Sequence, residues 1–350
     1  MPKSEQFVTL EIQLEEHPLE VIDYSVIIRT TGKAKEKYAG LLSSISLLSP
    51  QPKEVIVVLP EGYSLPEDRL GWETFYFCPK GMVIQRMTGI RNCKTRYALI
   101  CDDDVRFESD FVQKLYKPVF EGRCGLSAAP LYSFLPQKGV RAFADAIMAR
   151  ALPTVFHKNN RYISVLKSAG YSYNRLLQSG VNAYYETQSV AWTCFFADLE
   201  VLNSTDFHVE TWLDSHGYSA MDDQTMFYKA WLRGHKTIVV ADAHYDHLDG
   251  RTSRQNNAPA VLYSIPFNMI VFWHRFIYSL QPTGVKKVVS QVAFGYRLLW
   301  CHLWDLLSLI RKKTDQNDFI ITQQGYRDAW EYIKSDAYKA LPSVIKEHTQ

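Results

Sequence analysis

The sequence carries almost no net charge. Its 39 lysines and arginines are balanced by 37 aspartates and glutamates, which leaves a formal charge of +2 at pH 7. The net charge is too small to create an electrostatic field that attracts a polyanion, so we expect no nucleic-acid partner. The first 20 residues are charged and lack the apolar run of a secretory signal, and we therefore expect a cytoplasmic protein.

Cysteine pairs with the spacing of a metal site or a disulfide framework are also missing. The six cysteines are scattered and contain no CxxC pair. Buried free thiols in a reducing compartment are the expectation. Aromatic residues, in contrast, are plentiful at 13%, and 21 of them are tyrosines. This abundance suits carbohydrate binding, and equally an ordinary core.

The length points to more than one unit. A single core stops growing at roughly 250–300 residues, and this chain has 350. Its composition, 47% hydrophobic and 22% charged, is that of a packed globular protein. We expect an N-terminal extension (1–21), one catalytic core (22–257) and a helical C-terminal region (258–350).

Short apolar runs alternate with helical patterns in the core region. Residues 24–28 and 54–59 are typical of buried strands, and a stripe from Tyr38 to Leu48 predicts a helix between them. This β–α–β unit implies parallel strands and a right-handed crossover. Segment 131–190 has mixed periodicity and can be assigned little beyond some helix. Further strands are expected at 97–101, 125–129, 191–197 and finally 237–241, and helices at 82–92, 111–120 and 222–233.

An acidic triplet, Asp102 to Asp104, directly follows the strand at 97–101. Ligands of open α/β sheets bind at the carboxyl ends of strands, and carboxylates two residues apart can hold a hard cation. A solvated acidic turn or a helix cap would have the same sequence. The chain has no GxxxxGK[ST] motif, and Val105 and Arg106 follow the triplet, which excludes a P-loop and a DxDGT phosphatase.

Two further candidates lie downstream. Asp222 and Asp223 open the helix at 222–233, where they either complement the helix dipole or supply a general base. We expect the helix N-terminus to keep such a base ionised at neutral pH. His247 follows the strand at 237–241 and is either a metal or phosphate contact or a structural histidine.

These segments resemble the family 2 glycosyltransferases, which have the GT-A fold. Lys80-Gly81, Gln85-Arg86, the strand at 97–101 and the DDDV sequence at 102–105 follow the family's order and spacing. Segment 218–235 looks like its acidic acceptor element, and 241–247 like its post-strand segment ending in histidine. The resemblance covers roughly 22–250, with a looser likeness at 325–329. It implies a Rossmann-type, mostly parallel sheet flanked by helices, with a donor half (about 22–130) and an acceptor half (about 131–257).

The resemblance also implies a function. It is metal-dependent, inverting transfer of a sugar from a nucleotide-diphosphate sugar to a glycan or lipid-linked saccharide, as a hexosyltransferase of cell-surface polysaccharide synthesis. Asp102, Asp104 and His247 would hold Mn²⁺ or Mg²⁺. Asp223 would be the catalytic base, with Asp222 as the second candidate. The implied donor-binding residues are Arg29, Thr30, Glu61, Gln85, Arg86, Asp102 and Asp103.

Three features depart from the family pattern. The first loop reads RTTGK (29–33) instead of PxYN, the second strand ends in LPEG (59–62) instead of VDDGS, and Met87 replaces the asparagine of QRN. Glu61 is the candidate substitute for the base-contacting aspartate, which leaves the nucleotide open. A sugar-nucleotide nucleotidyltransferase remains an alternative, although its glycine- and lysine-rich loop is not evident. A non-catalytic sugar-binding or scaffold protein on the same core is another.

The tail from about residue 258 is helical in pattern. Between 285 and 310 it has an apolar stripe that includes Trp300 and Trp304, with basic residues nearby. Charges within the run disfavour a membrane span. The pattern is typical of a helix that lies on a membrane surface, here the inner face of the cytoplasmic membrane, or of one that packs on the core.

Overall fold

The computed structural model describes residues 22–131, 161–174, 180–248 and 259–345. The predicted boundary at 257/258 and the extension 1–21 lie outside these residues and stay predictions. The large sheet contains the strands β1 (Tyr24–Arg29), β2 (Glu54–Pro60), β3 (Thr74–Cys78), β4 (Tyr97–Asp102), β6 (Leu126–Ala128), β9 (Tyr184–Thr187), β10 (Cys194–Asp198) and β11 (Thr237–Val240).

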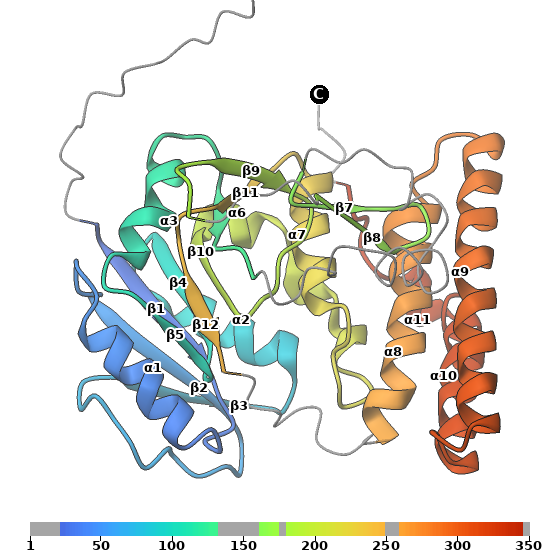
Figure 1. The fold of residues 1–350 in the computed structure, drawn as a ribbon, viewed down its shortest axis with the longest axis horizontal. Helices are drawn as coiled ribbons and strands as arrows, with labels where there is room; N and C mark the ends of the chain where they lie inside the picture. Colours follow the sequence, from blue (N-terminus) through green and yellow to red (C-terminus); the bar gives the residue numbers. More distant parts are fainter. Residues whose placement is uncertain (1–21, 132–160, 175–179, 249–258, 346–350) are drawn as a thin grey trace, which may run out of the picture.

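These eight strands lie in the order β3-β2-β1-β4-β10-β6-β11-β9 (Figure 1). The pairs β1–β2, β1–β4, β2–β3 and β6–β11 are parallel, whereas β10 is antiparallel to β4 and β6, and β9 is antiparallel to β11. The predicted α/β class with a mostly parallel sheet is therefore confirmed. Two small antiparallel sheets add β5 (Val105–Phe107) with β12 (Tyr245–His247), and β7 (Ile163–Val165) with β8 (Tyr171–Tyr173).

Helices cover both faces of the large sheet. Successive side chains of a strand point to opposite faces, so Val26 and Ile28 of β1 join one hydrophobic cluster and Ile27 joins the other. The first cluster includes α1 (Glu36–Ser46) and α3 (Phe111–Phe120), and the second includes α2 (Met82–Asn92), α6 (Leu199–Ser204) and α7 (Asp222–Leu232). Two short helical turns, η2 (Phe207–Val209) and η3 (Thr211–Leu213), precede α7.

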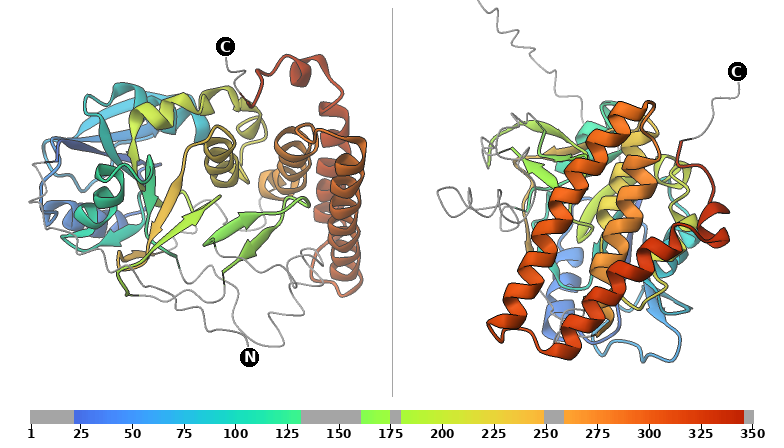
Figure 2. Two further views of the ribbon diagram at one scale, coloured as in Figure 1. Left: turned by 90° about the horizontal axis from the view of Figure 1, so that it is seen from above. Right: turned by 90° about the vertical axis from the view of Figure 1, so that its right-hand side faces the viewer.

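The C-terminal region is helical, as predicted, and lies at one end of the molecule (Figures 1 and 2). It consists of α8 (Pro259–Phe272), the π-helical turn η4 (Trp273–Tyr278), α9 (Gly284–Ile310), α10 (Gln316–Tyr332) and α11 (Asp336–Lys339). Among the described residues, only the continuous helix Pro259–Tyr278 is long and apolar enough to cross a membrane, and most of it is buried inside the molecule. A buried core helix has the same length and composition, so these features alone do not indicate a membrane span.

Several short strands were not predicted. The region 131–190 contains β7, β8 and β9 where little beyond helix was assigned, and β12 follows the strand that was taken as the last one. Strands of three or four residues are too short to show an alternation, and their pairing partners are distant in sequence. All six cysteines are unpaired as expected; Cys78, Cys101 and Cys194 are buried, and the other three are half-buried.

Candidate active site

The acidic triplet lies at the carboxyl edge of the parallel strands β1 and β4. Arg29, the last residue of β1, pairs in register with Asp102, the last residue of β4. This register brings the Arg29 Nη2 within 3.1 Å of the Asp102 Oδ1. The predicted strand-end position of the triplet is thus confirmed, and its first carboxylate meets a guanidinium group.

Asp103 is bound to the loop after β1. Its Oδ2 accepts a hydrogen bond of 2.5 Å from the Thr30 hydroxyl, and the Thr30 Oγ1 in turn accepts the Gly32 N–H at 2.9 Å. Burial raises the pKa of Asp103 to about 6, against the opposing effects of Thr30 and Arg29. Thr30 therefore holds the loop after β1 to the triplet.

Asp104 and His247 meet across the small sheet. The antiparallel pair β5–β12 places His247 opposite Val105, the residue after Asp104. The His247 Nε2 lies 3.5 Å from the Asp104 Oδ1, and the Leu248 N–H donates to the Asp104 carbonyl at 2.8 Å. The fold thus brings together two of the three predicted metal ligands, which are 143 positions apart in the sequence.

Arg86 of α2 connects the two acidic elements. Its guanidinium forms an ion pair with Asp222 at the start of α7, and its Nη2 lies 3.6 Å from the Asp102 Oδ1. The side chain is only 4% exposed and stacks on Trp192, with the guanidinium carbon 4.1 Å from the ring centroid. A side chain that stacks on an aromatic ring and reaches two carboxylates through different nitrogens requires arginine and not lysine.

Asp223 stands beside Asp222 at the N-terminus of α7. The preceding Met221 has a φ of 68°, a strained left-handed conformation for a side chain of this size. Burial, followed by the charge of Asp222, raises the pKa of Asp223 to about 7. Contrary to the expectation, the helix N-terminus therefore does not hold the pKa of this carboxylate low, because desolvation outweighs the helix dipole.

A cleft of about 450 Å³ opens next to the triplet. Three cationic side chains and two carboxylates face it, which suits an anionic ligand with polar groups. The Lys33 ammonium lies over the Tyr63 ring at 5.2 Å from its centroid. The lining residues are Arg29, Thr31, Lys33, Tyr63, Lys80, Gly81, Met82, Gln85, Asp103, Asp214, Gly217, Tyr218, Ser219, Ala260 and Val261.

The predicted donor-binding residues differ in their positions. Arg29, Gln85 and Asp103 line the cleft, whereas Thr30, Arg86 and Asp102 are not among its lining residues. The Gln85 Nε2 donates to the carbonyls of Thr30 and Val58 at 3.4 Å each, which fixes the ends of β1 and β2. Glu61 is exposed after β2 and is not one of the lining residues.

Asp214 was not predicted. Its carboxylate accepts hydrogen bonds from the first N–H groups of α2, at 2.7 Å from Met82 and 3.1 Å from Val83, and from the Ser219 hydroxyl at 2.7 Å. It thereby occupies the positive end of α2. The Lys80-Gly81 sequence before α2 offers no capping side chain, so the sequence indicates that a cap must come from elsewhere. It does not indicate that the cap is Asp214, which lies 132 residues after Met82.

The residues at Asp104 and His247 fit a divalent cation. Within the described ranges, no three His, Cys, Asp or Glu side chains form a preformed cage. Mg²⁺-type ions in phosphate-binding sites use one or two protein ligands and take the rest from phosphate and water. The Asp104 carboxylate and the His247 imidazole, 3.5 Å apart, could supply two such ligands.

Comparison with known proteins identifies the fold. No family model and no curated protein matches the sequence. The crystal structure of GalNAc-T7 with UDP, GalNAc and Mn²⁺ is similar with a TM-score of 0.50 and 15% identity, over 93% of this chain and 59% of that chain. This chain has the GT-A fold. A crystal structure of Staphylococcus aureus TarS 1–349 has a TM-score of 0.48 and 14% identity, over 88% and 81% of the two chains. Its complex with UDP-GlcNAc has a TM-score of 0.47 and 14% identity, over 92% and 82%.

Proposed function

We propose that this chain is a glycosyltransferase of the hexosyltransferase type. It transfers a sugar from a nucleotide-diphosphate sugar to a hydroxyl of a glycan or lipid-linked saccharide, in the synthesis of cell-surface polysaccharide. The observation that carries the proposal is one cleft, on a GT-A fold, with the acidic triplet at its edge and a carboxylate pair linked to that triplet by Arg86. The UDP and Mn²⁺ in the GalNAc-T7 structure support a nucleotide donor.

The donor's diphosphate finds positive partners in the cleft. Arg29, Lys33 and Lys80 line it, and charge-assisted hydrogen bonds to phosphate are among the strongest in proteins. Asp104 and His247, together with Asp102 two residues before Asp104, would hold Mn²⁺ or Mg²⁺. When bound, the cation neutralises the charge that develops on the departing diphosphate.

Asp223 acts on the acceptor. It takes the proton of the acceptor hydroxyl while that oxygen bonds to the anomeric carbon and the bond from that carbon to the diphosphate breaks. Attack from the face opposite the leaving group inverts the anomeric configuration. A base placed in this way contributes about 10²–10⁴-fold to the rate. Asp222 positions this base through its ion pair with Arg86.

A panel of sugar nucleotides tests the proposal. Release of nucleoside diphosphate is measured for each donor, with and without Mn²⁺, in the presence of a mixed saccharide acceptor. We expect release from a restricted set of donors and stimulation by the metal. Silence with every sugar nucleotide, from a folded protein, supports the scaffold alternative. Release of pyrophosphate from a nucleoside triphosphate and a sugar phosphate supports the nucleotidyltransferase instead.

A further inference from the structure

The helix α9 presents its apolar side to solvent. Nine of its large apolar residues fall within about 100° of the helix circumference, given 3.6 residues per turn, and Trp304 lies beside them. All ten are between 38% and 76% exposed. No charged residue falls within this arc. We call this surface the outer face of α9, and it consists of Val285, Val288, Val289, Val292, Leu299, Leu303, Trp304, Leu306, Leu307 and Ile310.

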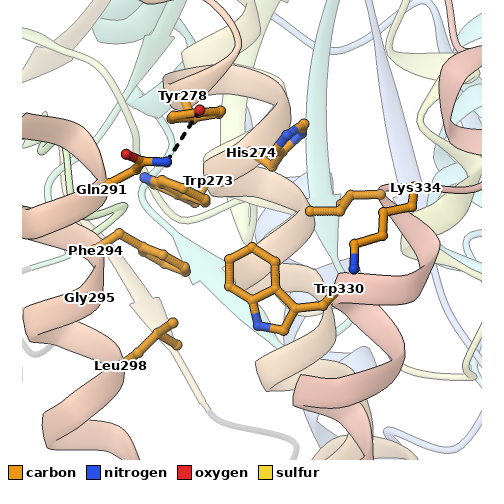
Figure 3. Close-up of a pocket in the computed structure, with 10 residues that line it drawn as sticks. Trp273, His274, Tyr278, Gln291, Phe294, Gly295, Leu298, Trp330 and Lys334 are labelled. Carbon is orange, nitrogen blue, oxygen red and sulfur yellow. Dashed lines mark hydrogen bonds between the residues drawn. The ribbon is translucent and has the colours of Figure 1, made fainter. Parts of the chain in front are cut away.

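The opposite side of α9 attaches it to the molecule through few apolar contacts. Its buried residues are Ser290 and Phe294. Phe294 stacks on Trp273 of η4 with ring centroids 4.2 Å apart, and the Trp273 indole N–H donates to the Ser290 hydroxyl at 3.1 Å. Figure 3 shows the Phe294 and Trp273 rings at an apolar groove of about 470 Å³ between α9, η4 and α10. The side of α9 that carries Ser290 and Phe294 thus faces the protein, and the outer face is directed away from it.

Exposure of this extent is unusual for a soluble surface. The largest apolar patch on a typical monomer is roughly 300–600 Å² and often marks a binding site. The outer face extends along a helix of 27 residues, or about 40 Å at 1.5 Å per residue. The helix α9 lies along the outer edge of the molecule in Figure 1 and in front of the viewer in the right-hand view of Figure 2.

The charges around the outer face indicate its partner. Residues 284–313 contain six basic side chains and a single acidic one, Asp305. The Asp305 carboxylate points to α10, where it accepts a hydrogen bond from Gln323 at 3.2 Å. Lys286 and Lys287 lie at one end of α9, and Arg311 to Lys313 follow the other end. A strip of apolar side chains with basic ends is complementary to an anionic lipid surface.

The same charges disfavour a second copy of the chain as the partner. An antiparallel pair of outer faces would bring Lys286 and Lys287 of one copy next to Arg311, Lys312 and Lys313 of the other. A parallel pair would place each basic end against the same basic end of the other copy. Either arrangement opposes like charges.

We propose that the outer face of α9 docks this protein on the surface of an anionic phospholipid bilayer, with the helix lying in the plane of the interface. The inference goes beyond the proposed transferase activity and does not depend on it. Vesicle flotation tests it without any turnover. The full-length protein should float with phosphatidylcholine vesicles that contain phosphatidylglycerol, and much less with phosphatidylcholine alone.

Two sets of substitutions separate the apolar and the charged contributions. Val292→Gln, Leu299→Gln and Ile310→Gln together should weaken binding to anionic vesicles at least tenfold. Lys286→Gln, Arg311→Gln and Lys313→Gln together should weaken it on the order of 100-fold, because each basic residue near an anionic surface is worth about fivefold. The matched control replaces exposed apolar residues elsewhere, Leu47→Gln, Phe77→Gln and Phe120→Gln, and should bind like the wild type.

Circular dichroism and light scattering accompany the flotation. The substituted positions are exposed, so the variants should keep the helical signal of the wild type. Equal flotation of the outer-face variant and the control overturns the proposal. A wild type that does not float, and that forms a dimer which the outer-face substitutions dissociate, assigns the face to self-association and also overturns it.

Discussion

Asp222 and Asp223 are neighbours in sequence but have different surroundings. Asp222 is paired with Arg86, whereas the Asp223 Oδ1 accepts the Gln224 N–H at 2.6 Å. Burial, and after it the nearby charge of Asp223, raises the pKa of Tyr171 well above that of an ordinary tyrosine. A carboxylate with a pKa of about 7 suits a base that must accept a proton near neutral pH and then lose it.

The pKa of Asp223 predicts the pH dependence of the enzyme. Because this pKa is raised from 3.8 to about 7, the carboxylate is protonated as the pH falls below 7. The kcat/KM for transfer should then fall about tenfold per pH unit below 7 and be level above it. Asp223→Asn should lose at least 10²-fold in kcat at pH 8 and keep its donor affinity.

Asp222→Asn is the matched variant for this prediction. It keeps the candidate base and removes a like charge, so the midpoint of the pH profile should move to lower pH. A loss of transfer in Asp222→Asn alone would exchange the two roles. Normal turnover and an unchanged pH profile in both variants would mean that the pair serves only the helix start.

His247 provides a second prediction at the residue scale. His247→Gln removes an imidazole 3.5 Å from Asp104, so Mn²⁺-dependent binding of UDP should weaken at least tenfold in calorimetry. His244→Gln is the control, because His244 is 60% exposed and pairs with the equally exposed Asp246. An identical Mn²⁺ response in His247→Gln and the wild type would remove His247 from the metal site.

Sequence reasoning found the site residues that are adjacent in motifs. Asp102 to Asp104 follow an apolar strand, and Asp222 and Asp223 open a periodic helix, so both could be located without a structure. Asp214 and Trp192 could not, because they act on α2 and Arg86 from distant parts of the chain. The raised pKa of Asp223 was also not predictable, since it depends on burial by residues that the sequence does not place.

A buried ion network joins several elements around α7. Glu210 and Lys229 are fully buried and 2.6 Å apart, and the Arg275 Nε of η4 donates to the Glu210 Oε2 at 2.8 Å. Burial favours the neutral acid, but Arg275 and Lys229 outweigh it and lower the pKa of Glu210. The Arg275 Nη2 also donates to the Pro342 carbonyl at 2.9 Å. The network thus fixes the C-terminal region to the core.

Removal of the central anion should destabilise the protein strongly. Glu210→Gln leaves two buried cations without their counter-charge, and we expect a loss of about 3–5 kcal/mol in the free energy of unfolding measured in urea. The exposed pair Lys236–Glu186 is the control, and Lys236→Gln should cost less than about 1 kcal/mol. Equal losses would mean that the buried network contributes no more than a surface pair.

Two glycines within helices predict opposite effects. A Cβ at Gly325 of α10 would lie 2.3 Å from the Tyr263 carbonyl of α8, so Gly325→Ala should force these helices apart and cost about 1–3 kcal/mol. A Cβ at Gly295 of α9 would have no atom of the described residues within 4 Å beyond the adjacent residues and the backbone of its own helix. Gly295→Ala should therefore stabilise the helix by about 0.5–1 kcal/mol. Thermal unfolding that ranks the two variants in the reverse order would contradict this packing.

At the scale of elements, long periodic segments were predictable and short ones were not. α2 and α3 occur at the predicted residues because a stripe of apolar positions extends over three turns. β5 and β12 have three residues each and exist because they pair with one another across the site. Their pairing, and with it the contact between His247 and Asp104, is a tertiary event.

At the scale of the whole molecule, the C-terminal helices complete the site. Ala260 and Val261 of α8 line the cleft, and the Asn268 side chain donates to the Ala220 carbonyl at 2.9 Å, just before the strained Met221. One hydrophobic cluster includes Ile27 of β1 together with Phe267 of α8. The sequence predicted the helices and the GT-A fold, but their role in the cleft wall depends on packing between distant segments.

The central claim is that the carboxyl edge of β4 holds a nucleotide-diphosphate sugar. A crystal structure with Mn²⁺ and the donor selected by the panel tests it most directly, because anomalous scattering locates the metal independently of the nucleotide. We predict one manganese peak between Asp104 and His247, the diphosphate beside it and the sugar directed to Asp223. A nucleotide bound outside the cleft, or a manganese ion remote from both ligands, would contradict the account.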